Sequence, residues 1–399
     1  MNSRSLLTHL FNYTIPYQYN KCSTLYLNKQ QFHLLTINRQ SVDDPIAHQV
    51  FRDIEHHLTE EEQITLKAEI NSFIRAHQLE IDEETKELAI LKAMATYATS
   101  NAHYGPVVQD WAHSLLDTAL ADNRKLIFLA RDGIAPFLAA KAIKAAHPSK
   151  YHTVELYLLY ISRTLAYSST LRDEKISSSD ALVYNYLKTV RKRDPMLLQK
   201  YILQETGMKE NDRCVFVDVG FGGSVIQPIK EQLEPLNIDV RFNFLISHTT
   251  KAKVGDRKFR ARGFLAHREK RPLEVVDKAG GNPAIHWVED THQSVMDSPK
   301  ILMVNDSGRI VPGKVVIADG RYHLRELFGK VVQTCKHAPE EFLIKSFGLK
   351  GVLNAIHPEK LSVHDTPVAW KEASEELRTR FGSFLSTLQQ RKRHLLLKH

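Results

Sequence analysis

The sequence predicts an α/β fold in which a central parallel sheet carries helices on both faces, in the Rossmann-like manner. Strand-like apolar runs alternate with helix-forming segments through the middle of the chain, and this alternation is typical of parallel sheets. The runs lie at 125–130, 154–161, 214–217 and 240–246, and a fifth strand is expected around 263–265. With 399 residues, of which 43% are apolar and 25% charged, the chain can bury a substantial core.

Three regions are expected along the chain: a mainly helical N-terminal lobe (1–122), an α/β catalytic or ligand-binding domain (123–268) and an α+β C-terminal region (269–399). In the first region, Thr59 followed by three glutamates indicates a helix start. Helical periodicity continues to Gly105-Pro106, where a break is expected, and then resumes.

The C-terminal region is expected to hold a hairpin followed by helices. The stretch Asp297–Val316 contains an Asp-Ser-Gly turn between two apolar runs, which predicts a β-hairpin. From Arg321 onward the spacing of apolar residues predicts helix. The residues that carry this spacing are Leu324, Leu327, Val331 and Val332.

The functional prediction centres on residues 213–227. Their sequence, RCVFVDVGFGGSVIQ, predicts a strand, a glycine loop and a helix. Asp218 ends the strand. Glycines then allow the backbone to turn tightly and to approach a ligand, and Ser224 is suited to the start of the following helix. Because a helix N-terminus presents unpaired N–H groups, the loop predicts a phosphate site. Its expected ligands are Gly220, Gly222, Gly223 and Ser224.

Polar residues follow three of the predicted strands: Arg131 and Asp132, then Ser162 and Arg163, then Asp218. In a parallel sheet these strand ends meet at one edge, where ligands bind. Guanidinium groups grip phosphate oxygens, and carboxylates bind divalent cations. We therefore expect Arg131, Arg163, Asp132 and Asp218 to be catalytic, Ser162 to contact the ligand, and the two aspartates to bind Mg²⁺.

Charge and cysteine usage narrow the class of protein. The net charge is +8, with basic clusters at 188–193, 251–262 and 391–398. These clusters lack interleaved aromatic residues, so a solvated surface is favoured over a nucleic-acid groove, although polyanion binding stays open.

Three widely spaced cysteines exclude a disulfide framework. Without a secretory signal or a long apolar run, the chain is expected to be cytoplasmic with no membrane span.

The order of these segments resembles type I phosphoribosyltransferases. LIFLARDGIAPFLAAKAI is similar to the pyrophosphate-loop segment of that family, YISR to its basic strand end, and VFVDVGFGGSVIQPI to its phosphoribosyl-binding segment. The family pattern has two adjacent acids, whereas Val219 follows Asp218 here. The resemblance implies an enzyme that acts on a phosphorylated sugar or nucleotide.

Alternatives remain open. Asp132, Ser162, a lysine at 188 or 192 and Asp218 also resemble the order of a HAD-like phosphohydrolase with Asp132 as nucleophile, although Ile134 stands where a second acid is expected. DVGFGGS is close to the loop of S-adenosylmethionine methyltransferases. A non-catalytic ligand-binding or interaction protein could use the same scaffold.

A wider resemblance covers residues 100–310. The run of Gly105-Pro106, Trp111, FLARDG, YISR, VDVGFGGS and SPKILMV resembles an uncharacterised domain of bacterial proteins linked to polysaccharide biosynthesis. That domain is often labelled HAD-like because it commonly follows a HAD-like module. No such module is present in this sequence, so the resemblance implies a fold more than a reaction.

Overall fold

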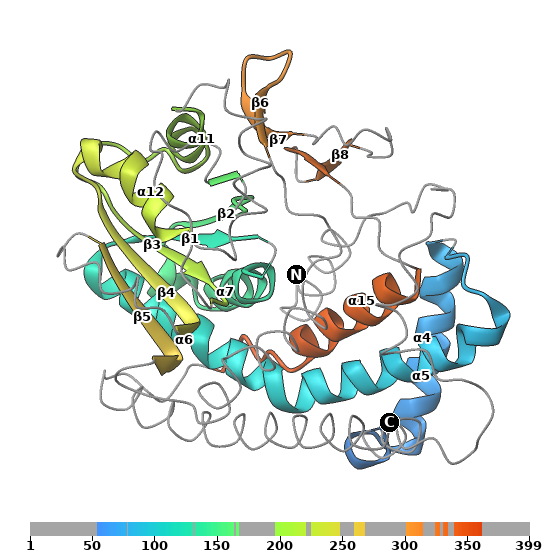
Figure 1. Cartoon of the computed structure of the whole chain (residues 1–399). Coiled ribbons are helices and arrows are strands. Elements are labelled where there is room, and N and C mark those ends of the chain that lie inside the picture. Colours follow the sequence, from blue (N-terminus) through green and yellow to red (C-terminus); the bar gives the residue numbers. More distant parts are fainter. Residues whose placement is uncertain are drawn as a thin grey trace, which may run out of the picture.

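The central sheet of the computed structural model has five strands in the order β2-β1-β3-β4-β5, all parallel. This confirms the predicted fold class (Figure 1). The strands are β1 (Lys125–Leu129), β2 (Leu156–Leu159), β3 (Arg213–Asp218), β4 (Asp239–Ser247) and β5 (Phe259–His267). The structure describes residues 54–77, 79–130, 132–162, 165–166, 196–220, 225–247, 259–267, 301–313, 324–327, 330–333 and 339–360.

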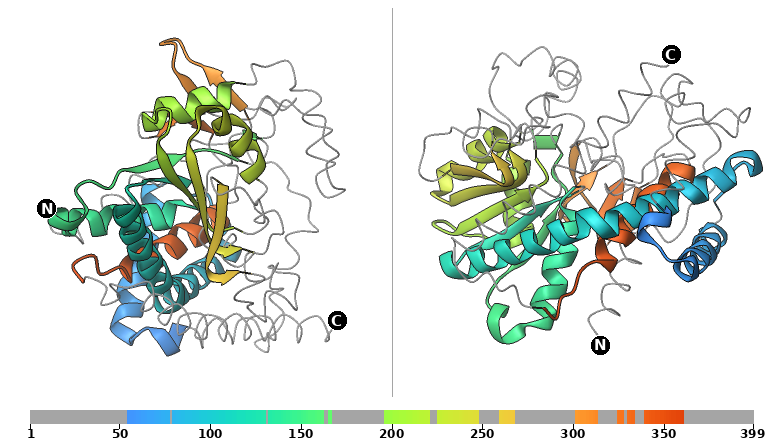
Figure 2. Two further views of the ribbon diagram at one scale, coloured as in Figure 1. Left: turned by 90° about the vertical axis from the view of Figure 1, so that its left-hand side faces the viewer. Right: turned by 90° about the horizontal axis from the view of Figure 1, so that it is seen from below.

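Helices cover both faces of this sheet (Figure 2). Successive strand residues point to opposite faces, so Phe128 packs with α6 and α7, whereas Ile127 packs with α11 and α12. Both faces of β1 are therefore apolar, which explains its uninterrupted hydrophobic run. The covering helices are α6 (Gly105–Asp122), α7 (Ile134–Ala146), α11 (Leu197–Thr206) and α12 (Ile226–Leu233).

The helical lobe begins with α4 (Glu60–Ala76), whose start agrees with the sequence. The Thr59 hydroxyl accepts a hydrogen bond from the Glu62 backbone, and the Glu62 side chain accepts one from the Thr59 backbone. This reciprocal capping box satisfies two backbone donors that a helix N-terminus leaves free.

The break expected at Gly105-Pro106 is wrong. Helix α5 (Glu83–Thr99) passes through the π-helical turn η1 (Ser100–Tyr104) directly into α6. The Gly105 N–H donates to the Ser100 carbonyl five residues back, so the chain takes in an extra residue without leaving the helix. Pro106 is the second residue of α6, and the helix continues through it.

Helix α15 (Pro339–Asn354), from the C-terminal region, packs against α5, η1 and α6 (Figure 1). The helices approach closely because glycines stand at the crossing. A Cβ atom on Gly351 would lie 2.3 Å from the Tyr97 carbonyl oxygen, and one on Gly105 would lie 2.3 Å from the Ala355 Cβ. Segments about 250 residues apart in the chain therefore share one core.

The C-terminal region contains two hairpins. The first, β6 (Ile301–Val304) with β7 (Ile310–Gly313), confirms the predicted one. The second, β8 (Leu324–Leu327) with β9 (Lys330–Gln333), occupies residues for which helix was expected, so that expectation is wrong. Leucine and valine occur in both kinds of element, and strand pairing decides between them here.

Arg124 connects elements at the amino edge of the sheet, where the strands begin. Its side chain is fully buried, forms an ion pair with Asp239 and donates to the Asp239 carbonyl at 2.9 Å. We expect Arg124→Met to lower the free energy of unfolding by about 2 kcal/mol, because a partly buried carbonyl loses its donor and the Asp239 carboxylate loses its buried cation.

Arg213 supplies the control for this prediction. It faces the same carboxylate of Asp239 at 3.6 Å, but its side chain is 45% exposed. Arg213→Met should therefore cost less than about 1 kcal/mol in urea denaturation. Equal losses in the two variants would contradict the role given to Arg124.

Candidate functional site

The sheet order reverses between β1 and β3, which lie side by side in parallel register. From β1 the chain moves outward to β2, and it then returns to place β3 on the other side of β1. At such a switch point the connecting segments diverge and leave a crevice outside the carboxyl ends of the strands. Asp218 is the last residue of β3, and Asp132 follows β1 by three residues.

A tight turn positions Asp132. The Gly133 N–H donates to the Leu129 carbonyl at 2.8 Å, and α7 begins at the next residue. A Cβ atom on Gly133 would lie 2.5 Å from that carbonyl oxygen, so the turn requires glycine. Asp132 consequently stands just before the first turn of α7, where backbone N–H groups favour negative charge.

A second turn follows Asp218. One of its carboxylate oxygens accepts a hydrogen bond from the Val219 N–H at 2.9 Å. Gly220 has φ of +122°, and a Cβ atom there would lie 2.0 Å from the Ile246 carbonyl oxygen of β4. The glycine predicted to contact phosphate is thus required for the backbone to pass β4, whatever else it binds.

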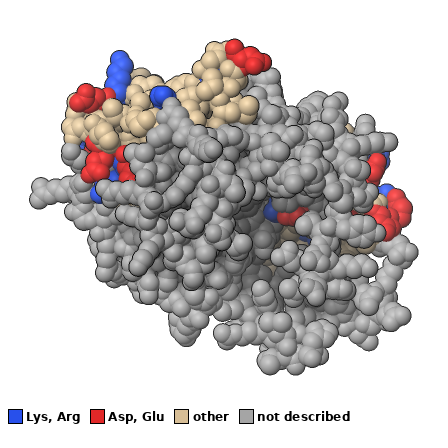
Figure 3. Space-filling model, turned by 45° about the horizontal axis from the view of Figure 1, so that its top comes forward, with Lys and Arg blue, Asp and Glu red and all other residues tan. Residues whose placement is uncertain are grey.

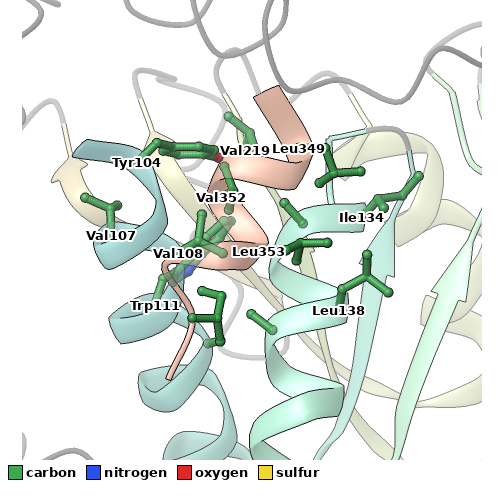
Figure 4. Close-up of a cluster of buried hydrophobic side chains, with 14 of the residues drawn as sticks. Tyr104, Val107, Val108, Trp111, Ile134, Leu138, Val219, Leu349, Val352 and Leu353 are labelled. Carbon is green, nitrogen blue, oxygen red and sulfur yellow. The ribbon is translucent and has the colours of Figure 1, made fainter. Parts of the chain in front are cut away.

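Tyr104 lies next to this second turn (Figure 4), and sequence reasoning did not single it out. Its side chain is 1% exposed and lies beside Val219 (Figure 4). Burial raises the pKa of its hydroxyl far above the ordinary value, and the negative charges of Asp132 and Asp218 raise it further. Both aspartates therefore act on one buried hydroxyl, and we call Asp132 and Asp218 the carboxylate pair.

The sequence contained one signal that could have pointed to Tyr104. The helical pattern changes phase across Gly105-Pro106, immediately after it. A phase change without loss of helix indicates a π-helical turn, which proteins often place at functional sites.

Ser162 follows β2 and lies on the same edge of the sheet. Its hydroxyl accepts a hydrogen bond from the Leu165 N–H at 3.0 Å, and its carbonyl accepts one from the Ala166 N–H at 2.9 Å. The hydroxyl thus stabilises a turn after the strand. The remaining predicted site residues, Arg131, Arg163, Gly222, Gly223 and Ser224, lie outside the described residues.

The carboxylate pair suits a magnesium ion by its donor chemistry. Mg²⁺ prefers oxygen ligands and is usually held by one or two carboxylates together with substrate phosphates. Across the ranges that the structure describes, no group of three or more histidine, cysteine, aspartate or glutamate residues could hold a metal ion. A cation at this edge would therefore depend on phosphate oxygens of the substrate as well as on the pair.

Where described residues reach the surface in Figure 3, lysine and arginine lie among aspartate and glutamate. Within the part of the chain that can be described, none of the helices is both long and apolar enough to cross a lipid bilayer.

No protein-family model matches the sequence, and no curated protein does so either.

Proposed function

We propose that the protein is an enzyme that acts on a phosphorylated sugar or nucleotide, and that the reaction is phosphoribosyl transfer. The observation that carries this proposal is the position of Asp132 and Asp218 at the carboxyl ends of the neighbouring strands β1 and β3. Ligands bind at the switch point of a parallel sheet. Two carboxylates there suit a substrate whose phosphate oxygens bind the same cation as the carboxylates.

In this proposal each residue has a defined task. When bound, Mg²⁺ would be held by Asp132 and Asp218 and would neutralise pyrophosphate charge. Arg131 and Arg163 would contact phosphate oxygens through their planar guanidinium groups. The backbone N–H groups of 220–224 would bind the 5-phosphate, as the resemblance to type I phosphoribosyltransferases implies. Catalysis would then consist of positioning the substrate and stabilising the charge that develops on it. The enzyme would be cytoplasmic, with its cysteine thiols free.

A phosphohydrolase is the second candidate, and one observation favours it. Asp132 and Ser162 follow β1 and β2, Asp218 ends β3, and these three strands are adjacent in the sheet. A carboxylate oxygen of Asp132 would attack phosphorus, the alcohol would leave with its bonding electrons, and water would then hydrolyse the acyl phosphate. This mechanism resembles that of HAD-like enzymes.

A thermal-shift experiment with phosphoribosyl pyrophosphate and Mg²⁺ tests the proposed site. A ligand at a hundred times its dissociation constant should stabilise the protein by about 2.7 kcal/mol. We expect this stabilisation in the wild-type protein and its loss in Asp132→Asn and in Asp218→Asn. The matched control is Asp306→Asn, which changes an exposed aspartate at the tip of the β6–β7 hairpin and should leave the stabilisation intact.

Product analysis separates the candidate reactions. Pyrophosphate release that requires an acceptor supports the transferase. Inorganic phosphate release from a chromogenic ester, lost in Asp132→Asn, supports the phosphohydrolase. Stabilisation by a phosphorylated ligand without either product supports a non-catalytic binding protein. Absence of stabilisation by phosphoribosyl pyrophosphate, nucleotides and nucleotide sugars would refute a phosphate site at this edge.

A further inference from the structure

The carboxyl end of β2 carries a backbone donor that the sheet does not pair. β2 is the outermost strand on its side, and successive residues of a strand direct their N–H and C=O groups to alternate sides. The Leu159 carbonyl accepts a hydrogen bond from the Ala130 N–H at 2.8 Å, so the backbone of Leu159 faces β1. The N–H of Tyr160, the next residue, therefore points away from β1. A buried N–H group in this position needs an acceptor from outside the sheet.

Tyr201 of α11 supplies that acceptor. Its hydroxyl oxygen accepts a hydrogen bond from the Tyr160 N–H at 3.1 Å, in a buried environment. The Tyr201 side chain is fully buried and shares an apolar cluster with Leu159 and Ile161, at the end of β2. Phenylalanine would fill the same volume but would offer no acceptor. The hydroxyl is therefore the group that joins α11 to the end of β2.

Helix α11 is itself held from another side. The Gln204 side chain donates to the Ile310 carbonyl and accepts from the Ile310 N–H, both at 2.9 Å. Beside it, Arg309 forms an ion pair with Glu205 at 3.1 Å. The β6–β7 hairpin thus attaches to α11 about one turn from Tyr201, and contacts on two sides fix the position of the Tyr201 hydroxyl.

The end of β2 leads directly into a turn that the proposed function uses. The Ser162 hydroxyl and carbonyl accept hydrogen bonds from the N–H groups of Leu165 and Ala166, at 3.0 and 2.9 Å. Leu165 and Ala166 are fully buried in the same apolar cluster as Tyr201. Arg163, which the proposed function assigns to phosphate oxygens, follows Ser162 in the sequence. Where β2 ends therefore decides where this turn, 162–166, begins.

We propose that Tyr201 is a positioning residue of the candidate site, and that its hydroxyl fixes the end of β2 from which the turn 162–166 begins. This inference rests on the proposed function, because it takes the turn to serve a phosphorylated ligand. Without the hydroxyl, the Tyr160 N–H would need another acceptor, and the strand end would move toward it. A displacement of about 1 Å is enough to impair a site that must hold its ligand in one orientation.

Calorimetric titration with phosphoribosyl pyrophosphate in the presence of Mg²⁺ tests the inference. We expect Tyr201→Phe to bind this ligand about 10-fold more weakly than the wild-type protein, because a buried donor at the start of the turn loses its acceptor.

Tyr151→Phe is the matched control. Tyr151 is also fully buried, and its hydroxyl donates to Asp117 at 2.8 Å, but it lies in α8 (Pro148–Tyr151), which precedes β2 in the chain. This variant should lose comparable stability and keep wild-type affinity for the ligand.

A double-mutant cycle with Arg163→Ala distinguishes positioning from a purely structural role. Arg163→Ala alone should weaken binding about 10- to 100-fold, because a charge-assisted contact to phosphate is lost. If Tyr201 acts through the turn, the addition of Tyr201→Phe to Arg163→Ala should weaken binding by less than about 3-fold more. Independent effects of the two substitutions would instead add, so Tyr201→Phe would have its full effect in both backgrounds.

The outcomes separate this inference from the proposed function. Wild-type binding that Tyr201→Phe leaves unchanged would overturn the role of Tyr201 and leave the proposed function intact. Equal losses of affinity in Tyr201→Phe and Tyr151→Phe, or full additivity with Arg163→Ala, would overturn that role as well. Absence of binding by the wild-type protein would refute the proposed function and this inference together.

Discussion

Gly220→Ala should lower the free energy of unfolding by at least about 3 kcal/mol, because it combines two separate costs. With φ of +122°, Gly220 adopts a backbone conformation that is essentially restricted to glycine. The added methyl group would also lie 2.0 Å from the Ile246 carbonyl oxygen. That oxygen belongs to a central strand, so relief of the contact would require β3 and β4 to separate. Chemical denaturation at neutral pH would measure the loss.

The variant Gly207→Ala serves as a control, because it measures the conformational cost without the steric one. Gly207 ends α11 with φ of +61°, and an added Cβ would meet nothing within 4 Å. Gly207→Ala should therefore cost about 1 kcal/mol, which is the conformational part alone. If the two alanine variants lose the same stability, the close approach of Gly220 to β4 does not contribute, and the loop has more room than the structure indicates.

The central sheet could be predicted because its signals are local. Strand β1 (Lys125–Leu129) is a short apolar run, and β3 (Arg213–Asp218) is an apolar run that ends in Asp218. Burial on both faces makes such runs continuous, and this distinguishes them from amphipathic helices. The convergence of Asp132 and Asp218 on one edge followed from the parallel arrangement alone. Their placement on adjacent strands did not, because strand order depends on contacts between distant segments.

Tyr104 and the π-helical turn depend on such distant contacts. A Gly-Pro pair usually ends a helix, so the sequence favours a break at Gly105-Pro106. The helix continues because α15 packs against the turn, with Ala355 seated over the space left by Gly105. Strands β8 and β9 were misassigned for a similar reason, since their pairing outweighs an apolar spacing that also suits a helix.

His113 connects the stability of this fold to pH. It lies on α6 with its side chain fully buried. Burial lowers the pKa of the imidazole from 6.5 to about 4. Of the groups around it, His147 and Lys150 lower the pKa further, whereas Asp117 and the backbone of Lys360 raise it. The neutral ring is thus the form that the folded protein accommodates.

The protein should lose about 2 kcal/mol of stability between pH 7 and pH 4.5 through His113 alone. The unfolded chain binds a proton at this residue below pH 6.5, whereas the folded protein does not until about pH 4. The stabilisation is therefore complete above pH 6.5 and disappears as the pH falls toward 4. Urea denaturation across this range should show a shallower pH dependence in His113→Leu, whereas replacement of the exposed His152 by leucine should leave the wild-type slope. If His113→Leu keeps the full slope, the acid sensitivity arises elsewhere, and His113 is protonated in the folded protein without cost.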